Sequence, residues 1–572
     1  MLKVIWGGDW DDLFARDAEH RIIQRAEEVV DGEFQNYAVQ PGWYMREHFF
    51  GVDERLLKLV ESIPDEQLKH LSRGGHDPEK IHAAYRAAME ADGRPTVILV
   101  NTIKGFGMGS AGEALNIAHN AKTMPLEALK TFRDQFELDL DDAALADPPF
   151  IRPNGKSAEI RYLLDRRQSL GGFVPKRTVP SRAMAMVDTR AFAEFHEGSG
   201  TREASTTMVF VRLLGKLLKD QNVGRQMVPI VPDESRTFGL DALFRQVGIY
   251  SHVGQLYEPV DHQNILYYHE ATDGQILEEG ITEAGSMASF LAAGTAYANH
   301  GVPMIPVYMF YSMFGFQRTG DQIWLAGDAR ARGFLVGCTA GRTTLNGEGL
   351  QHQDGHGHVL ASTVPNVKAY DPAFSYEVAV IFEDGLRRML NENEDSIYYL
   401  TLQNENYLHP PMPEDSRDGI IRGLYLLRPH ANPEARLRVQ LFGSGSILPR
   451  AIAAQEILRD QFGVDAAVWS ATSYKALRTD AMACDRWNLL HPEAAPHIPY
   501  IAQLLANAPG PVIAATDAMR LLPDSVARWI DRPFISLGTD GYGRSDTRPA
   551  LRRHFEVDER AIALAALAGL FR

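Results

Sequence analysis

Short apolar runs alternate with helical stretches along most of this 572-residue chain, and that alternation restricts it to folds built on parallel β-sheets. One such unit starts with the strand Arg438–Phe442 and continues through the loop Gly443–Ser446, the helix Ile447–Phe462 and the strand Ala466–Ala471. A strand, a helix and a second strand in this order form a crossover between parallel neighbours. The sequence therefore predicts an α/β protein.

A related pattern lies near the amino terminus. Residues 76–107 contain a helix with apolar positions at helical spacing, a Gly-Arg-Pro break and the largely apolar strand Thr96–Val100. We expect this strand in a parallel sheet that is covered on both faces. The Gly-rich loop Lys104–Gly109 leaves the carboxyl end of the strand, where such sheets place ligands.

The order of these patterns predicts three α/β domains with mainly parallel sheets. Residues 138–182 are rich in Asp and Pro and are interpreted as an irregular connecting segment. We therefore expect a first domain with its linker at 1–182, a middle domain at 183–412 and a third domain at 413–572. The expected strands of the middle domain are Met227–Val231, Val302–Met309, Gly333–Val336 and Ile397–Leu402.

Bulk properties exclude several classes of function. The chain has 58 Lys and Arg against 74 Asp and Glu, a net charge of -16, so nucleic acid is not an expected partner. The two cysteines, Cys338 and Cys484, lie far apart, which argues against a disulfide framework or a zinc site and fits a reducing compartment. No secretion signal and no run of about 18 apolar residues is recognisable, so the expected location is cytoplasmic, without a membrane partner.

Candidate chemistry is concentrated where His, Glu and Asp occur beside glycine. The segments are GEALNIAHNAK with Glu113 and His119, VPDESRTFG with Asp233 and Glu234, ILEEGITEAG with Glu283, and NGEGLQHQDGHGH with Glu348, His352, Asp354, His356 and His358.

Each segment also has an ordinary structural explanation. Glu283 suits a helix N-terminus, where a carboxylate meets the helix dipole. Asp233 and Glu234 suit a helix cap with an ion pair to a nearby arginine. Lys104 and His119 suit surface positions on loops.

Two further stretches have equally ordinary alternatives. The aromatic stripe Tyr308–Phe316 suits a buried strand end. Imidazoles at 352–358 suit a transition metal, but the stretch lacks the His-Glu-x-x-His spacing of a helical zinc site. No segment alone therefore decides the function.

Taken together and in order, these segments resemble the homodimeric, bacterial-type pyruvate dehydrogenase decarboxylating (acetyl-transferring) component. The resemblance extends from about residue 3 to about residue 565. It is carried by REHFFG, RGGHDPEKIHAAYRAA, NTIKGFGMG, NIAH, DESRTFGLDALFRQVGIY, QILEEGITEAG, YSMFGFQRTGDQIW, GRTTLNGEGLQHQDGHGH, YDPAFSYEVAVI, LFGSGSIL, RWNLLHP and GTDGYGRSD.

The resemblance implies a transketolase-like thiamine-diphosphate-binding fold that uses thiamine diphosphate and Mg²⁺. The implied reaction is oxidative decarboxylation of pyruvate, with transfer of the acetyl group to a lipoyl group. The implied partners are a second copy of the chain and a dihydrolipoyl acetyltransferase core with its lipoyl domains. Another short 2-oxo acid such as 2-oxobutyrate is an alternative substrate, because one methylene changes discrimination by only about 1–3 kcal/mol. A transketolase is a further alternative.

The resemblance also assigns cofactor contacts. Glu283 matches the family glutamate that bonds the pyrimidine ring nitrogen, and Phe314 matches the ring that stacks on the pyrimidine. Ile281 matches a residue at its other edge, and Lys104 a residue near the cofactor. Glu234 matches an acidic residue near the amino side of the pyrimidine.

Other positions match groups around the substrate. His352, Glu348 and Tyr311 resemble side chains around the substrate carboxylate and the developing hydroxyl, where a histidine can transfer protons near neutral pH. Asp233 accompanies Glu234 in the candidate catalytic set.

Two loops complete the implied site. His119 resembles a histidine on a mobile loop that helps transfer the two-carbon unit to the lipoyl group. Residues 252–266 match a second mobile loop, and such loops control access to a site. Leu115 stands where the family usually has a basic residue.

One expected motif is missing. Thiamine-diphosphate enzymes carry Gly-Asp-Gly, followed by Asn-Asn, to hold magnesium on the diphosphate. The fragments at 271–277, 383–393 and 538–543 do not fit, since they are read as a turn, a helix and part of the third domain. We therefore expect an incomplete first domain, truncation at the amino terminus and at the carboxyl terminus, and no metal ligands within this chain. A catalytically silent fragment or assembly partner is the corresponding alternative.

Overall fold

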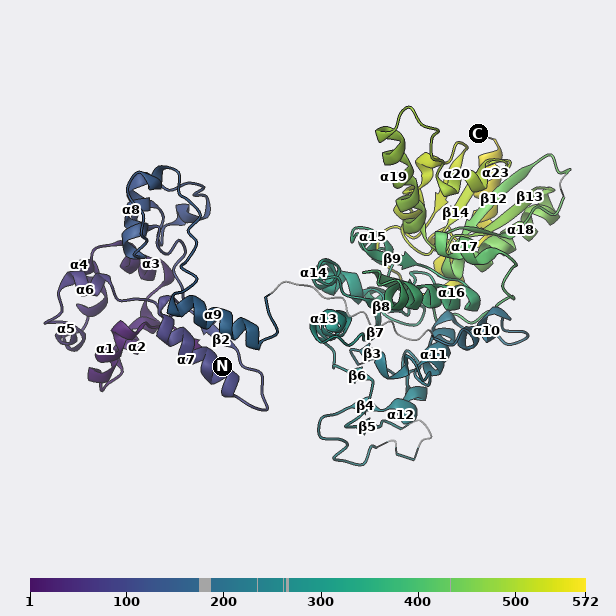
Figure 1. Cartoon of the computed structure of the whole chain (residues 1–572). Helices are drawn as coiled ribbons and strands as arrows, with labels where there is room; N and C mark the ends of the chain where they lie inside the picture. Colours follow the sequence, from purple (N-terminus) through teal and green to yellow (C-terminus); the bar gives the residue numbers. More distant parts are fainter. Residues whose placement is uncertain (174–186, 234, 261, 264–266, 433, 572) are drawn as a thin grey trace. The chain divides into compact units, whose positions relative to one another are not determined.

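The computed structural model describes residues 1–173, 187–233, 235–260, 262–263, 267–432 and 434–571. The chain divides into two units, Met1–Phe173 and Val174–Arg572. Figure 1 shows the course of the chain through both units. Each unit is described by itself.

The first unit is mainly helical around one small sheet. Strands β1 (Leu2–Val4) and β2 (Ile98–Val100) pair in parallel, with Leu2 opposite Ile98 and Val4 opposite Val100. Its core contains Trp10, which stacks on Phe50 at a centroid distance of 6.3 Å. The helices are α1 (Asp11–Arg16), α2 (Arg21–Glu28), α3 (Asp31–Val39), α4 (Gly42–Met45), α5 (Glu54–Leu59), α6 (Asp65–Lys69), α7 (Pro78–Glu90), α8 (Leu126–Gln135) and α9 (Ala158–Ser169).

Helix α7 starts as its sequence predicts. The Asp77 side chain accepts hydrogen bonds from the backbone N–H groups of Glu79 and Lys80, and Pro78 occupies the first helical position. The interpretation of 138–182 as irregular was wrong for α9, which begins where the Ser157 hydroxyl accepts from the Ile160 N–H. None of the residues of α9 is buried, so the segment lacks the apolar positions that would have indicated a helix. The capping residue Ser157 is the signal in the sequence that marks where the helix begins.

Strand β2 differs from the expectation of a covered strand. Leu99 is 45 % exposed and Val100 is 44 % exposed. An apolar run of this kind normally lies between two helical layers. Among the described residues of the first unit, β1 is the one strand that pairs with β2.

The second unit contains a six-stranded sheet in the order β6-β3-β7-β8-β10-β9, and every pair in it is parallel. Its strands are β3 (Met227–Val231), β6 (Leu277–Glu278), β7 (Ile305–Tyr311), β8 (Gly333–Cys338), β9 (Val367–Tyr370) and β10 (Ile397–Thr401). A separate parallel pair joins β4 (Ile249–Tyr250) to β5 (Glu270–Ala271).

Alternate residues of this sheet pack into two hydrophobic clusters. Val307 and Met309 of β7 belong to one cluster, and Tyr308 and Phe310 belong to the other. This alternation follows from the two-residue period of a strand, and it means that both faces are covered. The helices around the sheet are α10 (Arg190–His196), α11 (Thr206–Leu217), α12 (Asp241–Val247), α13 (Glu283–Asn299), α14 (Phe314–Asp328), α15 (Gly357–Ala361) and α16 (Ser375–Leu386).

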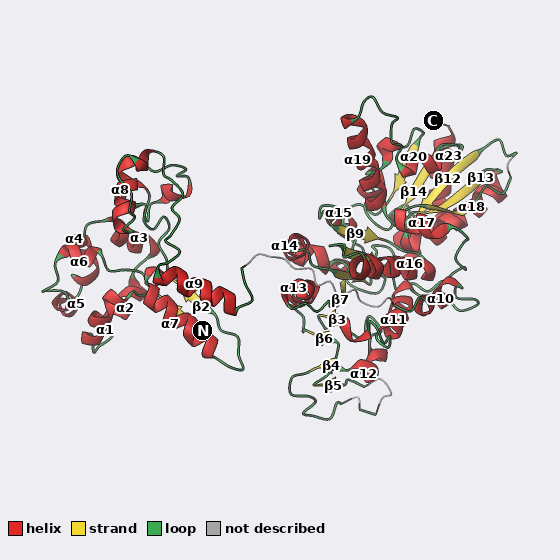
Figure 2. Ribbon diagram, in the orientation of Figure 1, coloured by secondary structure: helices red, strands yellow, loops and turns green. Residues whose placement is uncertain are grey.

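A five-stranded sheet in the order β11-β13-β12-β14-β15 follows in the same unit. Strand β11 (Tyr425–Arg428) is antiparallel to β13 (Asp465–Ser470), and the remaining pairs are parallel. The predicted crossover is formed by β12, α18 and β13 (Figure 2). The remaining elements are β12 (Arg438–Gly443), β14 (Val512–Ala515), β15 (Phe534–Leu537), α17 (Ser416–Arg422), α18 (Leu448–Phe462), α19 (Tyr474–Leu490), α20 (Tyr500–Leu505), α21 (Leu521–Asp524), α22 (Arg548–His554) and α23 (Glu559–Leu570).

Buried charges join the two sheets of the second unit. Glu377 of α16 is fully buried and accepts hydrogen bonds from the hydroxyls of Tyr425 and Ser470, both at 2.6 Å. The guanidinium of Arg552 forms a two-bond ion pair with Glu405. The predicted α/β class with mainly parallel sheets is confirmed. Within the described part of the chain, no helix is long and apolar enough to cross a membrane.

Candidate active site

Glu283 is the first residue of α13, as its neighbouring sequence predicts. The Thr282 hydroxyl caps the helix by accepting from the Gly285 N–H at 3.2 Å. The Glu283 carboxylate accepts a hydrogen bond of 2.7 Å from Arg318, and its side chain is only 11 % exposed. Burial raises the pKa of the neighbouring Tyr308 phenol, and the Glu283 charge raises it further. Glu283 is therefore a shielded carboxylate at a helix N-terminus.

Arg318 connects Glu283 to the aromatic side chain of Phe314. The guanidinium carbon of Arg318 lies 3.8 Å from the centroid of the Phe314 ring. This distance is within the range of a cation–π interaction. One arginine of α14 therefore holds a carboxylate and a ring face next to each other.

Tyr311, Phe314 and His352 form a continuous aromatic group. Tyr311 stacks on His352 at a centroid distance of 4.9 Å and an interplanar angle of 26°. Phe314 meets His352 edge to face at 5.2 Å and Tyr311 at 6.2 Å. The side chains proposed for the pyrimidine and for the substrate thus belong to one connected set.

Glu348 completes this set through His352. Nδ1 of His352 lies 2.6 Å from a carboxylate oxygen of Glu348. A carboxylate only accepts, so Nδ1 carries the proton and Nε2 is the basic nitrogen of the neutral ring. This arrangement orients a histidine whose second nitrogen can take up or release a proton.

The close approach of β7 and α14 requires glycine at position 315. A Cβ atom on Gly315 would lie 2.0 Å from the ring of Phe310, which is fully buried. The aromatic stripe therefore serves two purposes, since Tyr308 and Phe310 fill the core while Tyr311 and Phe314 contact His352. The core interpretation of this stripe was right for part of it.

Several of the predicted residues follow the carboxyl ends of neighbouring strands. Asp233 follows β3 and is exposed, Glu283 follows β6, and Tyr311 ends β7. Strand β3 lies between β6 and β7 in the sheet. Parallel sheets bind ligands at this edge, so the fold itself supports a site here.

The structure gives fewer contacts for the other residues predicted in this region. Ile281 is 75 % exposed beside the start of α13. Glu234 lies outside the described residues, as do 261 and 264–266 of the expected loop. In the described part of that loop, Leu256 is 79 % exposed, and the mobility of the loop stays a prediction.

The first unit contains a second group of predicted residues. Nζ of Lys104 lies 2.8 Å from Nδ1 of His119, although the two are fifteen residues apart. An ammonium only donates, so Nδ1 accepts and the proton of the neutral ring resides on Nε2. The two residues that sequence analysis assigned separately therefore form a pair.

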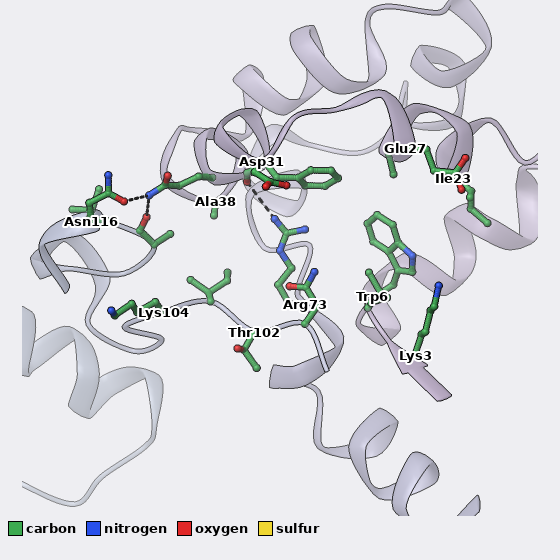
Figure 3. Close-up of a pocket in the computed structure, with 18 residues that line it drawn as sticks. Lys3, Trp6, Ile23, Glu27, Asp31, Ala38, Arg73, Thr102, Lys104 and Asn116 are labelled. Atoms are coloured by element: carbon green, nitrogen blue, oxygen red, sulfur yellow. Dashed lines mark hydrogen bonds between the residues drawn. The ribbon is translucent and has the colours of Figure 1, made fainter. Parts of the chain in front are cut away.

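A cavity of about 710 Å³ lies beside this pair, at the carboxyl ends of β1 and β2 (Figure 3). Lys104, Arg73, Asn101 and Gln35 line it. Burial lowers the pKa of Arg73, whose guanidinium lies over the ring of Phe34. Sequence analysis missed Arg73, although its place in RGGHD, just before α7, was a usable signal.

Within the described residues, no group of three or more His, Cys, Asp or Glu side chains could hold a metal ion. His358 of the histidine-rich stretch is buried, its Nε2 pairs with the Thr401 hydroxyl at 2.8 Å, and burial lowers its pKa.

Comparisons with known proteins match two parts of the chain to described families. Residues 183–410 match the family described as pyruvate dehydrogenase E1 component middle domain, and residues 423–558 match the transketolase-like C-terminal domain family. The chain is 53 % identical over 569 residues to the pyruvate dehydrogenase E1 component of Pseudomonas aeruginosa, covering 99 % of this chain and 64 % of the relative.

Other relatives give the same coverage. The E1 component of Mycobacterium tuberculosis is 48 % identical, with 100 % of this chain and 62 % of the relative covered. That of Escherichia coli K12 is 47 % identical, with 100 % and 64 % covered. The chain thus spans less than two thirds of the length of these curated relatives.

Solved structures share the fold at low identity. A transketolase from Campylobacter jejuni superimposes with a TM-score of 0.59 at 16 % identity, covering 86 % of this chain and 66 % of that one. A transketolase from Leishmania mexicana gives a TM-score of 0.58 at 15 % identity, covering 87 % and 65 %. These values show a common fold.

Proposed function

We propose that the chain belongs to the family of pyruvate dehydrogenase E1 components, and that its second unit binds the aminopyrimidine ring of thiamine diphosphate together with a 2-oxo acid. The observation that carries this proposal is the connected set of Glu283, Phe314, Tyr311 and His352. It combines a shielded carboxylate, an aromatic face and an oriented histidine in one place.

The ring of the cofactor fits this set. A carboxylate at a helix N-terminus accepts a hydrogen bond from a ring nitrogen, and the face of Phe314 supports stacking. Arg318 now pairs with Glu283 and covers Phe314, so ring binding requires this guanidinium to move aside. Thiamine diphosphate supplies the electron sink for decarboxylation when bound, and the chain orients the reactants.

The histidine pair supplies proton transfer. Nε2 of His352 is the basic nitrogen, and Glu348 stabilises the ring when it becomes protonated. Tyr311, stacked on the same imidazole, contributes a hydroxyl beside the substrate. These residues hold the substrate carboxylate and move a proton at the developing hydroxyl.

The first unit holds a basic pair, Lys104 and His119. His119 is assigned to the transfer of the two-carbon unit to a lipoyl group, and Lys104 to a place near the cofactor. Lys104, exposed beside a cavity of about 710 Å³, can place its charge toward an anionic group of the cofactor. The name of the relatives, pyruvate dehydrogenase E1 component, supports pyruvate as the substrate. The lipoyl domains of an acetyltransferase core are proposed as the acceptor.

Among the described residues, no group of three or more His, Cys, Asp or Glu side chains is available for magnesium. The ligands of the magnesium–diphosphate group are therefore assigned to polypeptide that carries the Gly-Asp-Gly to Asn-Asn motif. A homodimer, with the diphosphate held by one copy and the pyrimidine by the other, is part of the proposal.

A reconstitution assay tests the function. The chain is mixed with a polypeptide that carries the motif, together with thiamine diphosphate, Mg²⁺ and pyruvate, and release of carbon dioxide is measured with an artificial electron acceptor. Activity should appear in the mixture and fall at least about 10²-fold in Glu283→Gln. The exposed Glu493→Gln is the matched control and should leave the rate unchanged. A mixture that binds cofactor but never releases carbon dioxide would support the silent assembly partner instead.

A further inference from the structure

Asp354 is a buried carboxylate that none of the roles above uses. It lies two residues after His352 and is 5 % exposed. One of its oxygens accepts a 2.6 Å hydrogen bond from the Ser312 hydroxyl. The other accepts from the backbone N–H groups of His356 at 2.9 Å and Gly357 at 2.8 Å. These donors satisfy the carboxylate in a place where an unpaired charge would be costly.

These hydrogen bonds join two segments of the candidate site. Ser312 directly follows Tyr311 at the end of β7, and Asp354 closes the loop that carries His352. Tyr311 and His352 are separated by about forty residues along the chain, yet their rings stack at 4.9 Å. The hydrogen bond between Ser312 and Asp354 is a direct side-chain link between the two segments.

The surroundings leave Asp354 little freedom. A Cβ atom on Gly357 would lie 2.5 Å from its carboxylate, and one on Gly337 would lie 2.9 Å from the Ser312 hydroxyl. The Tyr399 hydroxyl lies 3.5 Å from the same Ser312 oxygen. These neighbours therefore lie close around the carboxylate and the Ser312 hydroxyl.

The charges that face Asp354 come from neighbouring elements. Burial lowers the pKa of the Arg342 guanidinium, whereas Asp354 raises it, so Arg342 helps to balance the carboxylate. Nδ1 of His356 lies 3.8 Å from the carboxylate, and the charge of Asp354 also acts on buried His358. Asp354, His356 and His358 of this stretch thus interact with one another or with neighbouring groups of the same chain.

We propose that Asp354 is a positioning residue that fixes His352 and Tyr311 relative to each other. It acts through the loop and through Ser312, and it touches no reacting atom. An effect of Asp354 on catalysis rests on the proposed function, whereas its effect on the positions of His352 and Tyr311 does not. It also assigns a role to the DGH part of the NGEGLQHQDGHGH segment.

Nuclear magnetic resonance of the full chain tests the geometry without any activity. The chain is labelled with ¹³C at histidine Cε1, and the His352 signal is identified by its loss in His352→Gln. The ring–ring cross-peak between His352 and Tyr311 is then compared in the unaltered chain, Ser312→Ala and Asp354→Asn. Asparagine keeps the size of the side chain but replaces one carboxylate oxygen by an NH2 group, so while its remaining oxygen accepts from the start of α15 it cannot also accept from the Ser312 hydroxyl.

Both variants should weaken the cross-peak, about threefold for a displacement of 1 Å, because the signal falls with the sixth power of distance. The matched control is Ser536→Ala, since the Ser536 hydroxyl also donates to an aspartate, Asp524, at 2.6 Å, but at an exposed position. The control should leave the cross-peak unchanged. An unchanged cross-peak in both Ser312→Ala and Asp354→Asn would overturn the proposal. If Asp354→Asn fails to fold, the milder Ser312→Ala decides.

A double-mutant cycle in the reconstituted enzyme tests the catalytic meaning. Asp354→Asn should lower kcat by about 10²-fold with little change in KM, as a misplacement of about 1 Å can. In the His352→Gln background the same change should cost less than about threefold, because its effect passes through His352. An equally large loss in both backgrounds would contradict the positioning role. If the variants weaken the cross-peak but the unaltered reconstituted mixture is inactive, the positioning role of Asp354 is supported and the proposed function is contradicted.

Discussion

The two parallel sheets closest to the candidate sites differ in how far they are covered. In β8 of the second unit, every residue from Gly333 to Cys338 is buried, whereas in β2 of the first unit Leu99 and Val100 are almost half exposed. Both strands have the same kind of apolar sequence. An apolar run therefore predicts a strand that should be covered on both faces, but the elements that pack next to the strand decide whether it is covered.

The same contrast extends to the polar chemistry. The second unit assembles a carboxylate, rings and a histidine around one strand edge, while the first unit presents basic residues around an open cavity. We therefore propose that the groups of the second unit's site are already assembled and that another polypeptide completes the first unit.

The largest expected effect is a difference in amide hydrogen exchange between the two sheets. Amides of β8 and β10 should exchange only through global unfolding, and those of β2 through local opening, so their rates should differ by at least about 10³-fold. Exchange of Leu99 as slow as that of Val336 would break the comparison, because it would show that β2 is covered.

Core truncation should show the same contrast in stability. Phe334 is fully buried and stacks on Phe382 at 3.8 Å, so Phe334→Ala should cost about 3–5 kcal/mol. Leu99→Ala should cost less than about 1 kcal/mol, since almost half of this residue is already exposed to water. Chemical denaturation of the full chain measures both, and equal costs would contradict the account.

Replacing an arginine should also lower stability more in the second unit than in the first. Arg552→Met leaves the Glu405 carboxylate buried without its partner and should cost about 3–5 kcal/mol. Arg73 is partly buried over Phe34 and lies against an open cavity, so Arg73→Met should change stability by less than about 1 kcal/mol. A larger loss for Arg73→Met would show that the first unit is already complete around it.

The smallest expected effect is a pH dependence centred on Lys475 in the second unit. Burial lowers the pKa of Lys475 to about 8, while its ammonium donates to the carbonyls of Ala361 and Val364. Because the unfolded chain holds this proton more tightly, stability should rise by about 2 kcal/mol between pH 8 and pH 10. The difference in unfolding free energy between the unaltered chain and Lys475→Met should show this rise, and a constant difference over that range would contradict the assignment.

Sequence patterns predicted the existence of the strands better than they predicted the limits of the strands or the helices between them. Strand β3 occurs at Met227–Val231 as expected, because its apolar run is bounded by residues that end a strand. Strand β7 is displaced to Ile305–Tyr311 from the predicted Val302–Met309, since pairing with β3 and β8, and not the start of the apolar run, sets its limits. Helix α9 was missed because acidic and proline residues dominate the composition around it.

The candidate site shows a similar limit. Glu283, Phe314, Tyr311, Glu348 and His352 were selected from a family pattern, and their contacts required the fold. The roles of Arg318 and Arg73 were not predicted, because each depends on a partner ring or carboxylate that lies far away in the sequence.

The most direct measurement is a calorimetric titration of the full chain with thiamine diphosphate in the presence of Mg²⁺. Stacking on Phe314 and a hydrogen bond to Glu283 together offer only a few kcal/mol before association entropy is subtracted, so about millimolar affinity is expected at best. Adding a polypeptide with the Gly-Asp-Gly to Asn-Asn motif should produce micromolar, magnesium-dependent binding that Glu283→Gln weakens. Micromolar, magnesium-dependent binding by the chain alone would contradict the proposal that another polypeptide completes the first unit.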